Sequence, residues 1–255
     1  GPSARVFPAM TYDPDNDRLL LFGGIAAASE GPQVMRDTWT LVRQADGKRA
    51  WEELAVTFPA TAPLDMSHTV RLAYMKSLRA PVLVVGYSDD ETLRVYLLDG
   101  AAWTERTVSG DRPRARDGFA LAYNEDDGEL YLYGGWGKER DNSSSQDYLG
   151  DLWRYNGERW EQVSAHGASG APPGRQNPVF AYDTGGKRLL LWGGEMDWNK
   201  RSYDVWAWAG SWKLARAGGE VFAPVNWDGR RRTFTLDVAR GVIVTVGGRL
   251  ADGKP

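Results

Sequence analysis

The 255-residue sequence contains no cysteine and only two histidines. The absence of cysteine excludes disulfides, a thiol nucleophile and a cysteine-based zinc site. A cytosolic protein and a disulfide-free exported protein both fit this composition, so the compartment is left open. No apolar run approaches the ~18–20 residues that a transmembrane helix needs, so we expect no membrane insertion.

Excess charge of one sign is also lacking, since 31 lysines and arginines face 34 aspartates and glutamates, for a net charge of −3. This balance argues against a nucleic-acid partner and against an anionic membrane surface. No segment has a convincing helical pattern. The 30 glycines and 12% aromatic residues are typical of many short strands joined by turns.

One pattern recurs along the chain: an apolar run that ends in a glycine pair, with a degraded copy at Gly86-Tyr87. The four intact pairs are Gly23-Gly24, Gly134-Gly135, Gly193-Gly194 and Gly247-Gly248. Each repeat predicts four strands, because its short runs are rich in aromatic and β-branched residues and are bounded by Gly, Asp and Asn. The predicted second strands are residues 18–22, 129–133, 188–192 and 242–246.

Three of the glycine pairs are followed by Asp-x-Trp and then by another tryptophan. The Asp-x-Trp motifs are Asp37–Trp39, Asp151–Trp153 and Asp204–Trp206. The later tryptophans are Trp51, Trp160 and Trp212, and the second repeat keeps only Trp103. Because these seven tryptophans recur at framework positions, we expect them to pack between neighbouring sheets.

Each repeat is about 50 residues long and has a strand that ends in Gly-Gly, then a Tyr or Trp, and then a Trp on its fourth strand. This pattern resembles the kelch repeat, which forms one blade of a β-propeller. The resemblance covers nearly the whole chain and implies an all-β propeller of kelch-like four-stranded blades, with about five visible and the last incomplete. The density of tryptophan and the degraded repeat favour a bacterial kelch-like protein. The expected repeats are residues 4–60, 61–110, 111–168, 169–218 and 219–255.

Residues 1–3, Gly-Pro-Ser, are typical of a remnant left by tag cleavage, so the expected propeller domain covers 4–255. The fifth repeat has its first two predicted strands and lacks its Trp-bearing pair. Two interpretations are open: a fragment of a longer protein with further blades, which we prefer, or a small native ring with one incomplete blade.

In kelch propellers the loops of one face usually bind the partner. A basic residue recurs eighteen residues before the glycine pairs, and the expected ring is Arg5, His68, Arg116 and Arg175, with Arg230 near the fifth position. Guanidinium groups at a channel mouth suit carboxylates, so we expect a protein or acidic peptide, or a small anion. The alternative is that each arginine pairs with a local carboxylate and braces the blades. The braces considered are Asp65, Asp111 and Asp117.

The loops after the glycine pairs differ most, and they carry Trp136, Arg140 and Trp198 outside the framework pattern. Aromatic residues beside arginine are typical of interaction hot spots, and they also suit stacking on a sugar ring. The alternative is that these tryptophans cap the blade ends.

We expect a protein- or peptide-binding scaffold that has no cofactor and no catalysis of its own. The alternatives are a propeller that binds carbohydrate or a small anion, a propeller enzyme, and a structural domain of a larger protein.

Copper oxidases similar to galactose oxidase need a Cys–Tyr crosslink that this chain lacks. Iron-binding kelch proteins use a Glu, Asp and His set, and Glu195, Asp197 and Asp204 have no histidine partner. Neither aspartate run, Asp15/Asp17 or Asp141/Asp147/Asp151, matches a calcium loop.

Overall fold

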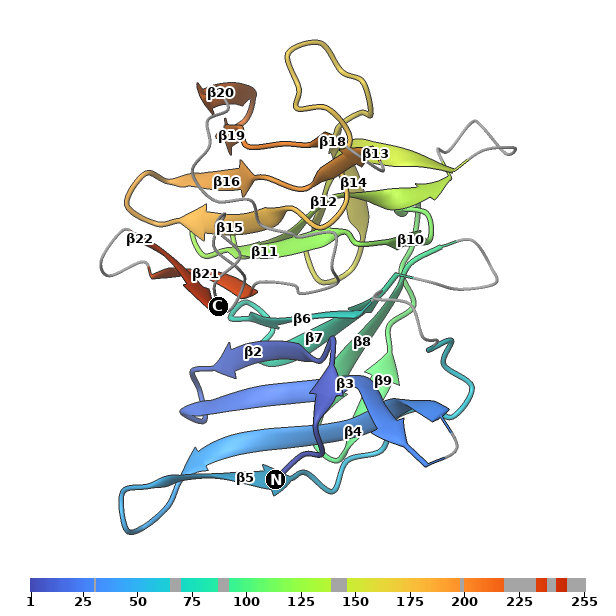
Figure 1. The fold of residues 1–255 in the computed structure, drawn as a ribbon, viewed down its shortest axis with the longest axis vertical. Helices are drawn as coiled ribbons and strands as arrows, with labels where there is room; N and C mark the ends of the chain where they lie inside the picture. Colours follow the sequence, from blue (N-terminus) through green and yellow to red (C-terminus); the bar gives the residue numbers. More distant parts are fainter. Residues whose placement is uncertain are drawn as a thin grey trace. The chain divides into compact units, whose positions relative to one another are not determined.

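A computed structural model describes residues 1–29, 31–64, 70–86, 92–138, 146–197, 200–217, 233–237 and 242–246. These residues form β-strands, turns and irregular segments (Figure 1). They contain no helix that is long and apolar enough to span a membrane.

Four antiparallel sheets, which we call blades 1 to 4, follow one another along the chain. Blade 1 contains β1 (Arg5–Val6), β2 (Ala9–Asp13), β3 (Arg18–Ala28), β4 (Gly31–Arg43) and β5 (Arg49–Glu53). Blade 2 contains β6 (Val70–Met75), β7 (Ala80–Val85), β8 (Arg94–Asp99) and β9 (Ala102–Glu105). Blade 3 contains β10 (Arg116–Asp117), β11 (Ala120–Asn124), β12 (Glu129–Lys138), β13 (Gln146–Tyr155) and β14 (Trp160–Ser164). Blade 4 contains β15 (Val179–Asp183), β16 (Arg188–Trp192), β19 (Val205–Trp208) and β20 (Trp212–Arg216).

Two shorter hairpins complete the described strands. β17 (Glu195–Asp197) pairs with β18 (Lys200–Arg201), and β21 (Thr233–Asp237) pairs with β22 (Val242–Val246). The last pair is the first half of the fifth repeat, as the sequence predicts. The predicted fold class, an all-β propeller of four-stranded blades, is confirmed, with the two-residue strands β1 and β10 added to blades 1 and 3.

In blades 1 and 4, the turn between the first two long strands is stabilised by an aspartate that recurs at the same position of the repeat. In blade 1, Asp13 accepts hydrogen bonds from the Asn16 side chain and from Arg18 Nε, both at 2.8 Å. In blade 4, Asp183 accepts from the Gly186 backbone N–H and from Arg188 Nε, both at 3.0 Å. The side-chain carboxylate thus satisfies the polar groups of the turn and determines where the second strand begins.

The glycine pairs do not end their strands in blades 1 and 3, which differs from the sequence prediction. β3 continues to Ala28 through a register shift between Phe22 and Gly24, and β12 continues to Lys138. Gly134 shows why glycine is required there. Its φ is +67°, and an added Cβ would lie 2.5 Å from the carbonyl oxygen of Arg175. A side chain at this position would therefore collide with the segment that enters the next blade.

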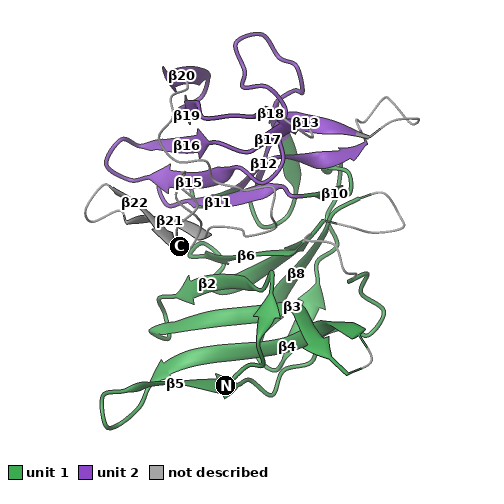
Figure 2. Cartoon of the chain, viewed as in Figure 1, with its two compact units in different colours: residues 1–117, 128–130, 155–161 green, residues 118–127, 131–154, 162–255 purple. Residues whose placement is uncertain are grey.

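The chain divides into two compact units, shown in different colours in Figure 2. Unit 1 comprises Gly1–Asp117, Gly128–Leu130 and Tyr155–Glu161. Unit 2 comprises Gly118–Asp127, Tyr131–Arg154 and Gln162–Pro255.

Each unit has its own hydrophobic core between two blades. In unit 1, Phe22 of blade 1 packs in one cluster with Tyr96 and Trp103 of blade 2. In unit 2, Tyr133 of blade 3 packs in one cluster with Phe180 of blade 4.

The tryptophans of the repeat contribute to these cores to different extents. Trp103, Trp153 and Trp160 are buried, whereas the other four repeat tryptophans are half-buried. Two of those four, Trp206 and Trp212, pack against the unit 2 core. The sequence prediction of packed tryptophans therefore applies most fully to blades 2 and 3.

Candidate functional site

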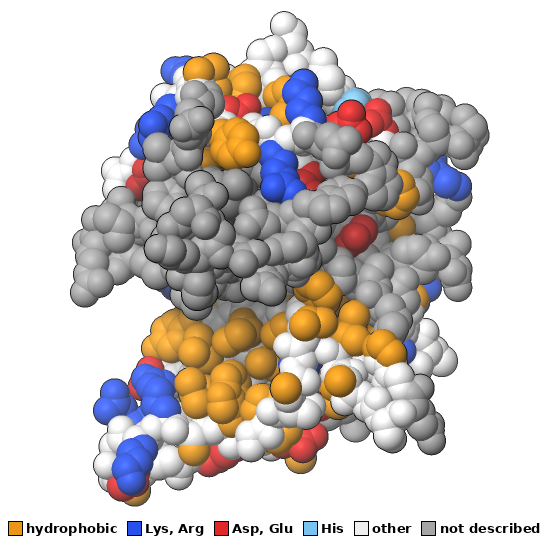
Figure 3. Space-filling view, viewed as in Figure 1, with side chains coloured by type: hydrophobic (Ala, Val, Ile, Leu, Met, Phe, Trp, Pro, Cys, Tyr) orange, Lys and Arg blue, Asp and Glu red, His pale blue; other side chains and the backbone are white. Residues whose placement is uncertain are grey.

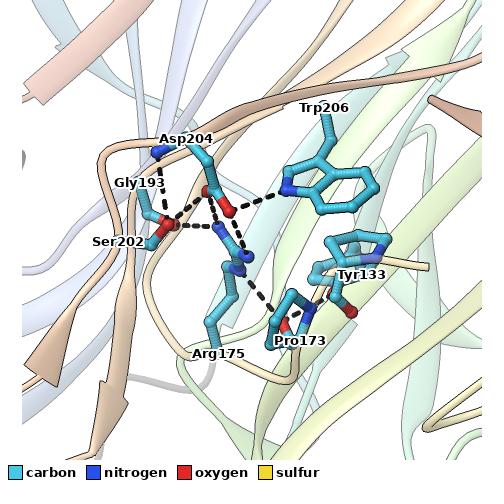
Figure 4. Close-up of polar contacts among 8 residues, drawn as sticks. Tyr133, Pro173, Arg175, Gly193, Ser202, Asp204 and Trp206 are labelled. Carbon is cyan, nitrogen blue, oxygen red and sulfur yellow. Dashed lines mark hydrogen bonds and ion pairs between the residues drawn. The ribbon is translucent and has the colours of Figure 1, made fainter. Parts of the chain in front are cut away.

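The repeat-position arginine of blade 4 is bound by the aspartate of the Asp-x-Trp motif (Figure 4). Arg175 donates two hydrogen bonds to the Asp204 carboxylate, at 2.5 and 3.2 Å. The same carboxylate accepts from Trp206 Nε1 at 2.7 Å and from the Ser202 hydroxyl. Arg175 also donates to two backbone carbonyls at 3.0 Å each, those of Pro173 and Gly193. We call this arrangement the Arg–Asp–Trp cluster.

Blade 1 contains the same cluster. Arg5 donates to both carboxylate oxygens of Asp37, at 2.6 and 2.9 Å, and Trp39 Nε1 donates to Asp37 at 2.6 Å. Arg5 Nη1 also donates to the Gly23 carbonyl at 3.0 Å, which corresponds to the contact of Arg175 with Gly193. The cluster therefore joins the strand-entry segment, the first glycine of the pair and the Asp-x-Trp strand within one blade.

Blade 3 contains the Asp–Trp part of the pattern, with Trp153 Nε1 donating to Asp151 at 2.6 Å. Arg116, at the repeat position of the arginine, is 3% exposed and donates from Nε to the Arg114 carbonyl at 3.0 Å.

The clusters lower the pKa of their aspartates. Burial alone would raise the pKa of Asp204, but hydrogen bonds from Arg175, the Ser202 hydroxyl and the indole outweigh it and lower that pKa below its usual value. In blade 1, burial also opposes the shift, and hydrogen bonds from Arg5 and Trp39 lower the pKa of Asp37. Both carboxylates are therefore charged at neutral pH and hold their arginines by charge-assisted hydrogen bonds.

The structure places the predicted binding arginines in the interior. The side chain of Arg175 is 0% exposed and that of Arg5 is 4% exposed, and the guanidinium of each is already bound to a carboxylate. The carboxylates that hold them are Asp204 and Asp37. Of the braces considered from the sequence, Asp65 lies outside the described residues, and Asp111 and Asp117 stay predictions. Contact of Arg5, Arg116 or Arg175 with a partner stays a prediction.

A signal in the sequence could have identified the true pairs. The arginine and the Asp-x-Trp motif occur together in the first, third and fourth repeats, and the second repeat lacks both. There His68 replaces the arginine, and Arg94 takes the position that corresponds to Asp37. Joint presence and joint loss of opposite charges at two repeat positions indicates an ion pair between them.

Of the other predicted site residues, the structure describes only Trp136. Trp136 lies half-buried on β12. Four predicted residues lie outside the described part of the chain: His68, Arg140, Trp198 and Arg230.

Segments after the glycine pairs, predicted as loops, form hairpins in blades 1 and 4. In blade 1, the ladder of β3 with β4 continues beyond the glycine pair to the Ala28–Gly31 pair. In blade 4, Glu195 and Arg201 are partners in the β17–β18 hairpin. By the antiparallel register, these hairpins extend from the end of each sheet opposite the turns that follow β2 and β15.

Tyr148 on β13 lies near carboxylates of the β17–β18 hairpin. Burial raises the pKa of Tyr148, and the nearby charges of Glu195, Asp197 and Asp147 raise it further. In the part of the chain that the structure describes, no group of three or more His, Asp or Glu side chains could hold a metal ion. His166 accepts a hydrogen bond at Nδ1 from the Gly150 N–H at 2.9 Å, so this histidine holds its loop against the middle of β13.

No family model matches the sequence. Among curated proteins, the chain is 31% identical over 142 residues to Multiple epidermal growth factor-like domains protein 8 of Homo sapiens. It is 30% identical over 142 residues to the protein of the same name from Mus musculus. Each match covers 53% of this chain and 5% of the relative, so the chain spans a small part of the length of these proteins.

Among solved structures, the chain is similar to the β-propeller YjhT, with a TM-score of 0.61 and 14% sequence identity. The similarity covers 98% of this chain and 79% of YjhT. This similarity supports the propeller fold. At 14% identity it shows the fold alone and nothing about function.

Proposed function

We propose that this chain is a kelch-like binding module that contacts a protein or peptide partner through the hairpins that follow its glycine pairs. The observation that carries the proposal is the contrast between constant and variable parts of the blades. Blades 1 and 4 share the Arg–Asp–Trp cluster and the glycine pair, whereas their hairpins differ in length and side chains. A rigid framework with variable connections at one end is the usual construction of a binding surface.

The exposed side chains of these hairpins indicate what such a surface would recognise. In blade 1 the hairpin presents small residues, with Ala27, Ala28 and Gln33 exposed. In blade 4 it presents both signs of charge, with Asp197 and Lys200 exposed. Because Arg5 and Arg175 are already bound to carboxylates, we place recognition on these exposed side chains. A protein surface of mixed charge suits them better than a purely acidic peptide.

The length comparison supports a place for this module within a longer polypeptide, because the matched relatives are about twenty times longer than their matched segment, as the 5% coverage implies. In such a protein the propeller would present its hairpins while other segments supply further functions.

Affinity capture with matched variants tests the proposal. The Asp197→Ala/Lys200→Ala variant removes one carboxylate and one ammonium from the hairpin end of blade 4. Its control, Asp126→Ala/Lys187→Ala, removes the same two charges from an exposed ion pair of 3.7 Å at the turn end in unit 2. Neither change should lower stability by more than about 1 kcal/mol.

The native chain is immobilised and its captured partner is identified by mass spectrometry. Its dissociation constant is then measured for the three proteins. We expect the hairpin variant to bind at least about tenfold more weakly, and the control to bind as the native chain does. Equal affinity in all three proteins would place the binding surface elsewhere. Failure to capture any specific partner would favour a structural role.

A further inference from the structure

The segment that joins blade 3 to blade 4, residues 165–174, is held against β13 near both of its ends. We call this segment the linker. Near its start, the Gly150 backbone N–H donates to Nδ1 of His166 at 2.9 Å. Directly after its end, the Arg175 N–H donates to the Leu149 carbonyl at 3.0 Å. All of these residues belong to unit 2, so the contacts lie within one compact unit.

The C-terminal end of the linker is fixed by close packing. A Cβ added to Gly174 would overlap the Tyr148 carbonyl oxygen, so the two backbones lie in contact. The buried Tyr133 hydroxyl also donates to the Pro172 carbonyl at 3.0 Å. These contacts are made by backbone groups and a tyrosine, which ordinarily do not titrate near neutral pH. The C-terminal end therefore stays on β13 whether His166 is charged or not.

The N-terminal part of the linker, residues 165–171, packs loosely. Besides His166 it contains only alanine, glycine and serine, and none of its side chains is buried. A Cβ added to Gly167 or Gly170 would meet no atom within 4 Å, so open space surrounds both glycines. A segment that buries so little apolar surface opens easily, and the hydrogen bond of His166 then decides whether it stays on β13.

The corresponding linkers of unit 1 are held in a different way. Six residues after the tryptophan of the fourth strand, the first two repeats have Thr57 and Ser109, and the third has His166. Thr57 forms a parallel bridge with Ala102, and Ser109 forms one with Arg159. Each of these bridges joins the linker by backbone contacts to the outer strand of the blade that follows. His166 instead holds its linker to the blade that precedes it, through a side chain that can change its charge.

The hydrogen bond to Gly150 requires a neutral His166. A neutral imidazole has one proton, here on Nε2, and accepts at Nδ1, whereas the imidazolium has an N–H at both nitrogens. Protonation would therefore place two donors, Nδ1–H and the Gly150 N–H, against each other. The His166 side chain is half-buried, and histidine is visible at the surface in Figure 3, so a proton reaches it from solvent.

The other charged groups around the linker keep their charge where histidine titrates. The linker itself contains no charged residue besides His166. The neighbouring elements have carboxylates and arginines: Asp147, Asp151 and Arg154 on β13, Glu161 on β14, Glu195 and Asp197 on β17, and Arg175 after the linker. Carboxylates ordinarily titrate near pH 4 and arginine above about pH 12. Histidine is therefore the type of side chain that changes its charge here between about pH 5 and 8.

We propose that His166 is a pH-sensitive latch, which holds residues 165–171 on β13 while it is neutral and releases them when it is protonated. The release is local, because the packing of Gly174 and the Tyr133 hydrogen bond keep the rest of the linker in place. The Arg–Asp–Trp cluster of blade 4 begins only after this fixed end, so it stays intact. The latch does not depend on the binding surface proposed above.

Exchange of the Gly150 amide proton, followed by NMR, tests the latch. Its protection factor is the exchange rate of an unstructured peptide divided by the measured rate at the same pH. This factor is compared at about pH 7.5 and about pH 5, which bracket the titration of histidine. The Leu191 amide serves as the internal control, because Leu191 lies on β16 between two paired strands and reports on unfolding of the sheet.

Three variants are measured beside the native chain. His166→Ala removes the acceptor, and His166→Asn keeps an oxygen acceptor that does not titrate. His68→Gln removes the other histidine of the chain and is the matched control for pH effects that do not involve His166.

In the native chain and in His68→Gln, we expect the Gly150 protection factor to fall at least about fivefold between the higher and the lower pH, because the amide loses its acceptor. His166→Asn should stay protected at both pH values, and His166→Ala at neither. Leu191 should stay protected throughout. Equal Gly150 protection at the two pH values in the native chain would overturn the proposal. The same fall in His166→Asn, or a parallel fall at Leu191, would overturn it too.

Discussion

Replacing Arg175 with methionine should destabilise the protein severely, because it leaves the Asp204 carboxylate without its main partner. The substitution keeps a long unbranched side chain and removes the guanidinium. It deletes the two hydrogen bonds to Asp204 and those to the Pro173 and Gly193 carbonyls. The Arg175 side chain is 0% exposed, so water cannot replace these contacts without local opening.

The magnitude follows from the burial of the pair. Removing one partner of a buried ion pair costs about 3–5 kcal/mol, because the remaining charge is left uncompensated. For a chain of this size, each kcal/mol lowers the melting temperature by about 2–4 °C, so we expect a decrease of about 6–20 °C. Urea unfolding followed by tryptophan fluorescence gives the free energy directly, and the 12 tryptophans provide the signal.

Arg188→Met is the matched control. Arg188 pairs with Asp183 at 3.0 Å, but its side chain is 44% exposed, so its removal should cost no more than about 1 kcal/mol. A loss below about 1 kcal/mol for Arg175→Met as well would refute the reasoning. It would show that the guanidinium contributes little to the framework and would favour the alternative in which the arginines serve a ligand.

Two further predictions concern the same framework. Because the pKa of Asp37 and Asp204 is lowered on folding, the stability they contribute is present above the unfolded value of 3.8 and is lost as pH falls through their folded values. Urea unfolding below about pH 4 should therefore show a steep loss that is shallower in Asp204→Asn. Gly134→Ala, with a φ of +67° and a Cβ 2.5 Å from a carbonyl oxygen, should cost roughly 2–5 kcal/mol by strain and overpacking. Gly47→Ala, with a φ of +83° and open space around its Cβ, should cost about 1–2 kcal/mol, and equal losses would contradict the steric argument.

The predicted arginine ring shows where sequence reasoning ends. The recurrence of Arg5, Arg116 and Arg175 is visible in the sequence, but recurrence alone does not distinguish a binding ring from a brace. The structure shows the guanidinium groups of Arg5 and Arg175 bound to Asp37 and Asp204, which lie 32 and 29 residues later. Because a strand pair lies between each arginine and its carboxylate, only the register of the sheet brings them into contact.

The hairpins after the glycine pairs have a similar explanation. The sequence of residues 25–36 is rich in alanine and glycine and has no strong strand pattern, so it predicts a loop. In the folded chain, β3 and β4 already lie side by side below the glycine pair, and the backbone hydrogen bonds extend beyond it to Ala28 and Gly31. Pairing with a neighbour already in place outweighs weak local preference.

The propeller fold and the strands that precede the glycine pairs could be predicted from the sequence alone, because they depend on short patterns that recur along the chain. Turn aspartates such as Asp13 and Asp183 act through residues close to them in the chain. The tertiary structure decided which repeated positions are buried. Counted back from the closing pairs of their first hairpins, Met10 and Tyr12 of blade 1 hold the positions of Leu72 and Tyr74 of blade 2. Met10 and Tyr12 are about half exposed, whereas Leu72 and Tyr74 are buried. Leu72 belongs to the core that blade 2 shares with blade 1, and a pairing between blades cannot be deduced from the pattern of one repeat.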